Sequence, residues 1–388
     1  MSTIKNLIKS ASSASELRAL LKFKMSEVPN QDAINLEFSA LAKSDIDFCF
    51  DALTKVSRSF AIVIQQLPVE LKEAVGIFYL VLRGLDTVED DMNLDEIEKE
   101  KMLRSFYKYC YLTDFRLNGI GDTADYQLLL ENFDKVTRSF LNLKEEYKDV
   151  IADICFRMGN GMADSISYKI QTVKDYDIYC HYVAGLVGQG LSELFAASGF
   201  EDESLVEEMA KANSMGLFLQ KTNITRDYLE DFDAGRVFWP EEIWKQFHEE
   251  LSFYKLIPES ANSLKGLNYM VKDAIRHLPD CINYLKLLKN EEVFRFCAIP
   301  QLMAVATLVE LYDNVEVFNR NVKIRKGLSA RILMETKNVD TVIIMLCQFI
   351  EELSDKMQRS NNTPADMWQS IHEIKIALGY KLDNPIIF

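Results

Sequence analysis

Long stretches with the apolar period of an α-helix run through most of this chain of 388 residues. Gly (15 residues) and Pro (8 residues) are sparse for this length, and the alternating pattern of a β-strand is nearly absent. With 48% hydrophobic residues the chain can bury a large core. We therefore expect an all-α protein built as one large helical domain. The ranges expected to be helical are 35–65, 68–91, 94–112, 125–143, 145–169, 175–199, 203–229, 262–289, 294–319 and 340–357.

The two ends of the chain differ from this helical body. Residues 1–34 form a short amphipathic segment without the continuous apolar stretch of a secretory signal. We expect the helical domain to cover 35–357 and the remainder, 358–388, to hold a loop, a short helix and a tail without a membrane anchor. The apolar run 296–312 is interrupted by polar residues and the run 341–350 is short, so neither is expected to span a bilayer.

Charge and cysteine usage narrow the possible functions. The net charge is −15 and no long basic block is present, which argues against nucleic-acid binding. An acidic protein that binds an anionic phosphate substrate needs metal ions and a local basic patch. The seven Cys are scattered without CxxC pairs, which indicates reduced thiols in a cytosol-facing compartment.

Two short acidic runs, 86–91 and 227–231, each follow an apolar helical stretch. Both place carboxylates at i, i+3 and i+4, which fall on one face of a helix. Two such patches facing each other would repel unless cations lie between them, and Mg²⁺ prefers carboxylate oxygens and is commonly shared with substrate phosphates. We therefore expect a magnesium site. For the first run alone, a solvated helix end is an equal alternative, and the second run shifts the balance towards a metal site.

Other polar residues extend this pattern. Gln220 and Asn223 precede the second acidic run and add oxygen ligands or hydrogen bonds to phosphate. The segment 323–326, Lys-Ile-Arg-Lys, stands out in so acidic a chain and suits phosphate, although a solvated loop is the alternative. Tyr179 lies in an aromatic-rich stretch that ordinary packing would also explain. All four histidines (181, 248, 277 and 372) are interpreted as structural.

Several segments in order carry a family resemblance. They are 56–65, 78–92, 179–188, 217–231, 296–301 and 322–327. In these segments the chain resembles the squalene synthase (farnesyl-diphosphate farnesyltransferase) family, among the head-to-head trans-isoprenyl diphosphate synthases. The resemblance runs from about residue 45 to residue 330. It implies an isoprenoid synthase fold with a central cavity, two molecules of farnesyl diphosphate as substrate, and Mg²⁺ and NADPH as cofactors.

The resemblance also implies roles for individual residues. Tyr179 would transfer a proton in the first half-reaction, helped by Arg83 or Arg226, and Phe296 would line the wall around the carbocations. Phosphates of substrate and NADPH would be bound by basic and polar side chains. The metal ligands would be Asp86, Glu89, Asp90, Asp227 and Asp231, and the phosphate or cofactor ligands Ser57, Arg58, Arg83, Asn223, Arg226, Arg236, Lys323 and Arg325.

The same resemblance also implies an oligomeric state and a cellular location. We expect a monomer, with a peripheral or lost membrane association. Eukaryotic members of the family end in a hydrophobic anchor, which is not seen in the final residues here. We expect the endoplasmic reticulum membrane if an anchor was removed, and the cytoplasm or the membrane surface otherwise.

Two other functions remain open. A phytoene- or dehydrosqualene-forming synthase would share the fold but stop before hydride transfer; the segments 296–301 and 323–326 favour the reductive enzyme. A non-catalytic helical interaction protein would not need the acidic runs. A terpene cyclase is disfavoured, because the second run lacks the Asn-Asp-x-x-Ser-x-x-x-Glu pattern usual in that class.

Overall fold

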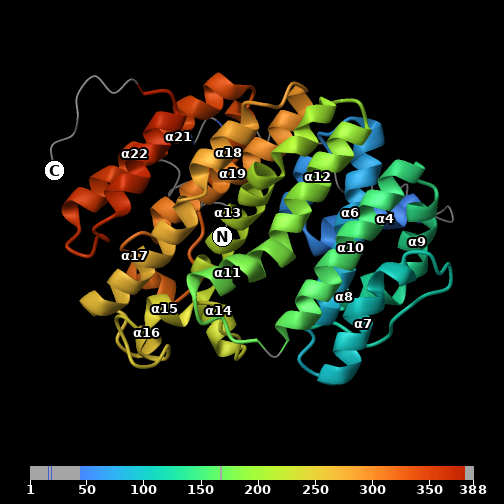
Figure 1. The fold of residues 1–388 in the computed structure, drawn as a ribbon, viewed down its shortest axis with the longest axis horizontal. Coiled ribbons are helices and arrows are strands. Elements are labelled where there is room, and N and C mark those ends of the chain that lie inside the picture. The colour runs from blue at the N-terminus through green and yellow to red at the C-terminus, as the bar shows by residue number, and fades with distance from the viewer. Residues whose placement is uncertain (1–15, 17–18, 20–43, 167, 381–388) are drawn as a thin grey trace. The chain divides into compact units, whose positions relative to one another are not determined.

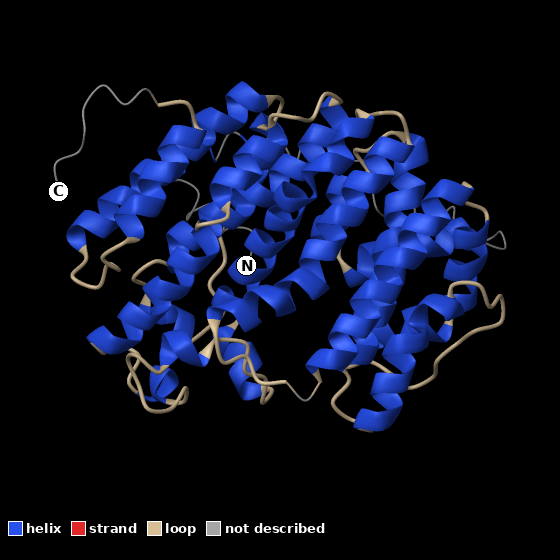
Figure 2. Ribbon diagram, viewed as in Figure 1, coloured by secondary structure: helices blue, strands red, loops and turns tan. Residues whose placement is uncertain are grey.

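The computed structural model describes residues 16, 19, 44–166 and 168–380. Within this part of the chain only helices and their connecting loops occur, as Figure 2 shows, so the all-α prediction is confirmed. The chain divides into two compact units. Unit 1 comprises Met1–Ser26, Lys169–Gly185 and Ala210–Phe388, and unit 2 comprises Glu27–Tyr168 and Leu186–Met209. The domain boundaries expected from sequence, with one domain over 35–357, stay a prediction.

Unit 2 is built around α6, Val69–Asp90 (Figure 1). This helix is apolar on nearly every side and buries Phe78, Leu80 and Leu85 completely or almost so, as expected of a helix surrounded by others. Its neighbours in contact are α4, α5, α7, α8, α9, α10 and α12. The helices of unit 2 are α4 Asp45–Val56, α5 Arg58–Ile64, α7 Glu96–Tyr109, α8 Ala124–Glu131, α9 Phe133–Leu141, α10 Glu145–Ser165, α12 Leu186–Ala197 and the 3₁₀ helix η2 Glu203–Glu208.

Unit 1 has a buried helix of its own, α19, Glu291–Leu311. By length and composition α19 could cross a membrane, but 78% of its apolar window is buried inside the structure, as in the core helix of a folded domain. It contacts α17, α18, α20 and α21. The other helices of unit 1 are α11 Val173–Cys180, the π-helix η1 His181–Gly185, α13 Met209–Arg226 (from Ala210), α14 Tyr228–Asp233, α15 Glu241–Trp244, α16 Phe253–Leu256, α17 Ala261–Ile275, α18 Leu278–Leu285, the 3₁₀ helix η3 Val315–Phe318, α20 Lys326–Glu335, α21 Val339–Arg359 and α22 Met367–Ala377.

Local sequence explains where these helices begin. Thr172 and Asp175 form a capping box at the start of α11: the Thr172 hydroxyl accepts from the Asp175 N–H, and the Asp175 carboxylate accepts from the Thr172 N–H. Asn338 and Thr341 do the same at α21. Such caps satisfy the N–H groups that a helix start leaves without intrahelical partners.

The structure divides several ranges that were expected to be continuous. The range 125–143 breaks at Asn132 into α8 and α9, 175–199 contains the π-helix η1, and 203–229 starts as a 3₁₀ helix. Helix α20 was not expected at all. The predicted N-terminal amphipathic segment lies outside the described residues except for Glu16 and Ala19, and the last eight residues, 381–388, lie outside them as well.

Candidate active site

The first acidic run closes α6 in unit 2. Asp86 lies in the last turn but one and pairs with the guanidinium of Arg83, one turn earlier on the same helix. Arg83 also donates to the Tyr79 hydroxyl (3.2 Å) and lies over the ring of Tyr126 (5.5 Å to the centroid). Burial disfavours the charge of Arg83, but Asp86 and the Tyr79 hydroxyl outweigh it and keep the Arg83 pKa above its ordinary value.

The other acids of this run have different surroundings. Glu89 is half-buried, and its backbone carbonyl accepts from Lys99 Nζ at 2.7 Å. Asp90, the last residue of α6, is exposed. Asp91 is buried, and its two oxygens accept from the N–H groups of Asn93 and Gly121, each at 2.9 Å. Asp91 therefore holds the loop after the helix.

The second acidic run lies in unit 1 at the junction of α13 and α14. The run was expected on one continuous helix, but α13 ends at Arg226 and Asp227 stands between the two helices. Arg226 holds the Asp227 carboxylate by a two-pronged contact, Nε to Oδ1 at 2.8 Å and Nη2 to Oδ2 at 2.6 Å. This bidentate form is the strong geometry for a guanidinium and a carboxylate.

Asn321 joins this group although the sequence gave no reason to select it. Its Nδ2 donates to Asp227 Oδ1 (3.1 Å) and to Glu230 Oε1 (3.0 Å), and its own Oδ1 is buried without a hydrogen-bond partner among the described residues. Asn321 lies two residues before Lys323. It therefore connects the second acidic run to the start of the basic segment 323–326 within one unit.

Asp231, one turn further along α14, is the acid with the most altered proton affinity. Burial raises its pKa to about 6, Arg236 opposes that rise, and the charges of Asp227 and Glu230 add to it. Arg236 donates to Asp231 Oδ1 from Nη2 at 3.0 Å and from Nε at 3.2 Å. The raised pKa of Asp231 therefore reflects burial first and the neighbouring carboxylates second.

Tyr179 occupies the last turn of α11 in unit 1. Its side chain is half-buried and stacks on the ring of Phe238, with 5.1 Å between centroids. Immediately after α11 the chain winds into the π-helix η1, and single π turns are frequent at functional sites. His181, the first residue of this turn, contacts Asn213 (Nδ1 to Oδ1, 2.6 Å), which agrees with a structural role.

The basic segment leads into α20. Lys323 and Arg325 are exposed, and Lys326 is the first residue of the helix. Arg325 donates to Glu16 Oε1 at 2.8 Å, and Ala19 packs against Ala330 of α20. A side chain predicted to bind a phosphate of the cofactor thus contacts a carboxylate of the N-terminal segment.

The remaining predicted residues are scattered. Ser57 lies between α4 and α5 and is half-buried. Arg58 begins α5, and its side chain is outside the part of the chain that the structure describes. Asn223 is exposed on α13, whereas Phe296 is buried in α19 with 4% of its surface exposed.

The structure thus brings some predicted residues together inside each unit. In unit 2, Arg83 pairs with Asp86. In unit 1, Arg226 pairs with Asp227, and Arg236 pairs with Asp231. The two acidic runs belong to different units, so their placement on opposite walls of one cavity stays a prediction.

The donor chemistry of these residues suits a hard cation. Within the described residues, no group of three or more His, Cys, Asp or Glu is arranged to hold a metal ion; arginines neutralise Asp86, Asp227 and Asp231 instead. The buried Oδ1 of Asn321 has no donor among the residues that the structure describes, and burial, with a smaller contribution from Asp227 and Glu230, keeps the pKa of Asp231 raised although Arg236 pairs with it. Oxygen ligands of this kind are those that Mg²⁺ takes.

Comparisons with known proteins agree on one family. A family model described as squalene/phytoene synthase matches residues 53–327. The squalene synthase of Homo sapiens is 46% identical over 333 residues, 86% of this chain and 79% of that protein. The squalene synthase of Rattus norvegicus is 43% identical over 365 residues, 93% of this chain and 86% of that protein.

Solved structures show the same similarity. The structure of TcSQS in complex with the ligand BPH1237 is 43% identical, covers 86% of this chain and 98% of its own, and gives a TM-score of 0.82. A dehydrosqualene synthase in complex with a ligand is 20% identical with a TM-score of 0.54, covering 78% of this chain and 97% of its own. At that identity the second match supports the fold alone.

Proposed function

Because the chain belongs to the squalene/phytoene synthase family, we propose that it joins two molecules of farnesyl diphosphate head to head and reduces the product to squalene with NADPH. Its function is that of a squalene synthase, an isoprenoid-forming transferase. The observation that carries this conclusion is the match to curated squalene synthases, 43% identical over 93% of the chain in one case and 48% identical over 82% in another.

The proposed reaction has two halves. In the first, one farnesyl diphosphate loses diphosphate and leaves an allylic cation, the double bond of the second attacks it, and loss of a proton closes a cyclopropane to give presqualene diphosphate. In the second, presqualene diphosphate loses its diphosphate, the cation rearranges, and one hydride gives squalene. The sum consumes two farnesyl diphosphates and one NADPH, and yields squalene, two diphosphates, NADP⁺ and one proton.

The acidic runs are proposed to prepare the departure of diphosphate. Asp86, Glu89 and Asp90 in unit 2, and Asp227 and Asp231 in unit 1, would hold Mg²⁺, which when bound neutralises the leaving diphosphate. With these carboxylates engaged by the metal, the guanidinium groups that now pair with them would be available for phosphate oxygens. The contacts of Arg83, Arg226 and Arg236 with the acids support this exchange.

Tyr179 is proposed to accept the proton that is lost when the cyclopropane closes in the first half-reaction. A phenol with an ordinary pKa near 10 is a weak base, so it needs an anionic partner such as the released diphosphate to take the proton onward. The stacked ring of Phe238 supports this role, because it holds the Tyr179 ring in one plane.

The reductive half is proposed to use the basic segment. NADPH when bound supplies the hydride, and Lys323 and Arg325 would bind its phosphate groups, which guanidinium and ammonium groups suit. Their exposure supports this role, and the link through Asn321 places the start of the segment beside the second acidic run.

A product assay tests the proposed function. Purified protein is incubated with farnesyl diphosphate and Mg²⁺, with and without NADPH, and the products are extracted and identified by mass spectrometry. Squalene with NADPH and presqualene diphosphate without it are expected. Dehydrosqualene as the main product at saturating NADPH would refute the reductive assignment, and no diphosphate release under any condition would refute the transferase.

Contact with a membrane belongs to the same proposal, since squalene is an apolar hydrocarbon that must leave the protein for a lipid phase. Flotation of the chain with vesicles of neutral and anionic lipids measures this contact directly. Absence of the chain from both vesicle fractions would contradict a peripheral association.

A further inference from the structure

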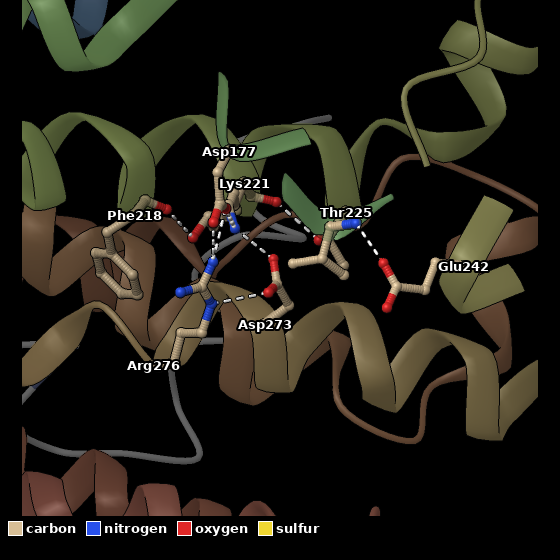
Figure 3. Close-up of polar contacts among 9 residues, drawn as sticks. Asp177, Phe218, Lys221, Thr225, Glu242, Asp273 and Arg276 are labelled. Carbon is tan, nitrogen blue, oxygen red and sulfur yellow. Dashed lines mark hydrogen bonds and ion pairs between the residues drawn. The ribbon is translucent and has the colours of Figure 1, made fainter. Parts of the chain in front are cut away.

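A fully buried lysine joins three helices of unit 1. Lys221 on α13 has no exposed side-chain surface, and its Nζ lies 2.5 Å from Asp177 Oδ1 on α11 and 2.5 Å from Asp273 Oδ2 on α17 (Figure 3). Arg276, the residue directly after α17, completes the group: its Nη2 lies 2.6 Å from each oxygen of Asp177, and its Nε lies 2.8 Å from Asp273 Oδ1. We call these four residues the Lys221 network.

The network is balanced in charge, with two cations and two carboxylates. Burial raises the pKa of Asp177, but Lys221 and Arg276 outweigh burial and hold that pKa below its ordinary value. The ring of Tyr176, also on α11, lies 4.7 Å from Lys221 Nζ and adds a cation–π contact. All four charges are therefore compensated, which a buried ionic group requires.

Stability alone does not explain such a network. Taking the buried charges of Lys221 and Asp273 out of water costs about as much as their attraction returns, and well-packed apolar residues often replace buried ion pairs without loss. What buried ion pairs add is directional geometry, because each contact fixes the position of one helix against another.

The helices that the network joins carry the residues of the proposed chemistry. Asp177 lies two residues before Tyr179 on α11, and Lys221 lies six residues before Asp227 at the end of α13. These elements also approach closely at small residues. A Cβ added to Gly216 would lie 2.1 Å from the carbonyl oxygen of Ala184. The segment after Tyr179 therefore rests directly on α13.

We propose that the Lys221 network is a positioning device that sets Tyr179 on α11 relative to the second acidic run at the end of α13. Lys221, Asp177, Asp273 and Arg276 act through Tyr179 and are not themselves catalytic. The inference rests on the proposed function of Tyr179 in the first half-reaction. A displacement of about 1 Å can cost about 100-fold in rate. Removing the contacts of the Lys221 network should therefore displace Tyr179 and strongly slow the formation of presqualene diphosphate.

The decisive variant removes the ion pair between α11 and α13, Asp177 with Lys221, and keeps the net charge unchanged. Lys221→Met with Asp177→Asn removes one cation and one anion and leaves the Asp273–Arg276 pair at the end of α17. The matched control is Lys272→Met with Asp366→Asn, the same two replacements at a pair that joins α17 to the start of α22. Rates of presqualene diphosphate formation without NADPH, and thermal unfolding, are measured for both variants alone and combined with Tyr179→Phe.

A positioning role predicts non-additivity. The network variant should lose about 10- to 100-fold in kcat with little change in KM for farnesyl diphosphate, and should lose nothing further in the Tyr179→Phe background, whereas the control should stay within about twofold of the parent. Equal losses from the network change in both backgrounds would overturn the inference. If the double replacement does not fold, Asp177→Asn alone is carried through the same cycle. Parent-like activity of Tyr179→Phe itself would instead refute the proposed role of that tyrosine.

Discussion

Three carboxylates of the acidic runs each contact an arginine close to them in the chain: Asp86, Asp227 and Asp231. Of these, Asp227 has an additional partner, since the Asn321 amide donates to it from 94 positions away. An amide in this place fixes the direction of the carboxylate. Groups that orient a metal ligand typically change metal affinity by 10- to 100-fold when removed.

Asn321→Ala should therefore raise the Mg²⁺ concentration needed for half-maximal presqualene diphosphate formation by about tenfold. The rate at saturating Mg²⁺ should change little, because Asn321 contacts the carboxylates and is not assigned a role in the reaction. A Mg²⁺ titration of initial rate measures both quantities. Asn319→Ala, an exposed neighbour with the same replacement, serves as control. An unaltered Mg²⁺ requirement in Asn321→Ala would contradict the role given to this amide.

The buried side chain of His277 leads to a separate prediction, that the free energy of unfolding falls at acidic pH. It is buried at the start of α18, and burial first, then the positive charges of Lys221 and Arg276, lower its pKa to about 3, with Asp177 opposing. The unfolded chain takes up a proton near the ordinary pKa of 6.5, whereas the folded chain does not until about 3. Stability should therefore fall as the pH drops through this window, by about 2 kcal/mol between pH 7 and pH 5 for this group alone.

Urea unfolding at pH 7 and pH 5 checks this loss. His277→Gln should show a smaller difference between the two pH values than the parent, because its side chain takes up no proton on unfolding. His372→Gln leaves His277 in place and should retain the parent's difference. The assignment fails if His277→Gln and the parent lose the same free energy on acidification.

Helix α20 and the segment before it form an element with two faces. Its buried side packs in unit 1 through Leu328 and Ile332, while Lys323 and Arg325 remain exposed at its start. Glu16 already contacts Arg325, so a phosphate of the cofactor would compete with this carboxylate. The proposed cofactor role therefore assigns this element to the reductive half of the reaction.

Lys323→Ala with Arg325→Ala should thus raise KM for NADPH by about tenfold or more, as expected for the loss of two contacts to phosphate, and leave presqualene diphosphate formation within about twofold of the parent. The two half-reactions are followed separately by product analysis. Lys337→Ala with Arg320→Ala removes the same residue types outside the segment and serves as control. Equal loss of both half-reactions would speak against a cofactor role for this element.

The sequence predicted the elements of the molecule better than their interruptions. Helix α6 follows the expected range within a residue at each end, because an all-apolar helix ending in acids has an unambiguous pattern. The break before Asp227 was missed, since residues on both sides keep helical spacing and backbone contacts. The π-helix η1, His181–Gly185, was missed because so short a π turn has no sequence pattern that separates it from the flanking α-helices.

The candidate site shows the same limit. Residue types at fixed spacing pointed to the acids and the basic segment, and the family resemblance pointed to Tyr179. A contact such as that between Asn321 and Asp227 depends instead on how distant segments fold together. The Lys221 network joins three helices that are far apart in sequence, and each of its members alone resembles an ordinary surface charge. Local patterns do not contain such information.

The two acidic runs lie in different units of the molecule, and the proposed function assigns both runs to the binding of Mg²⁺. Under the proposed function, Asp86→Ala and Asp227→Ala should each reduce diphosphate release from farnesyl diphosphate by more than about 100-fold, because each would remove carboxylate oxygens proposed to hold the cation at the leaving group. Circular dichroism and thermal unfolding should show the fold retained, since both side chains are only partly buried.

Asp149→Ala in α10 and Asp355→Ala in α21 replace exposed acids in the same two units and should keep parent activity. Turnover near the parent rate in either Asp86→Ala or Asp227→Ala, measured by diphosphate release over a range of Mg²⁺ concentrations, would show that the corresponding run is a solvated helix end and not part of a shared metal site.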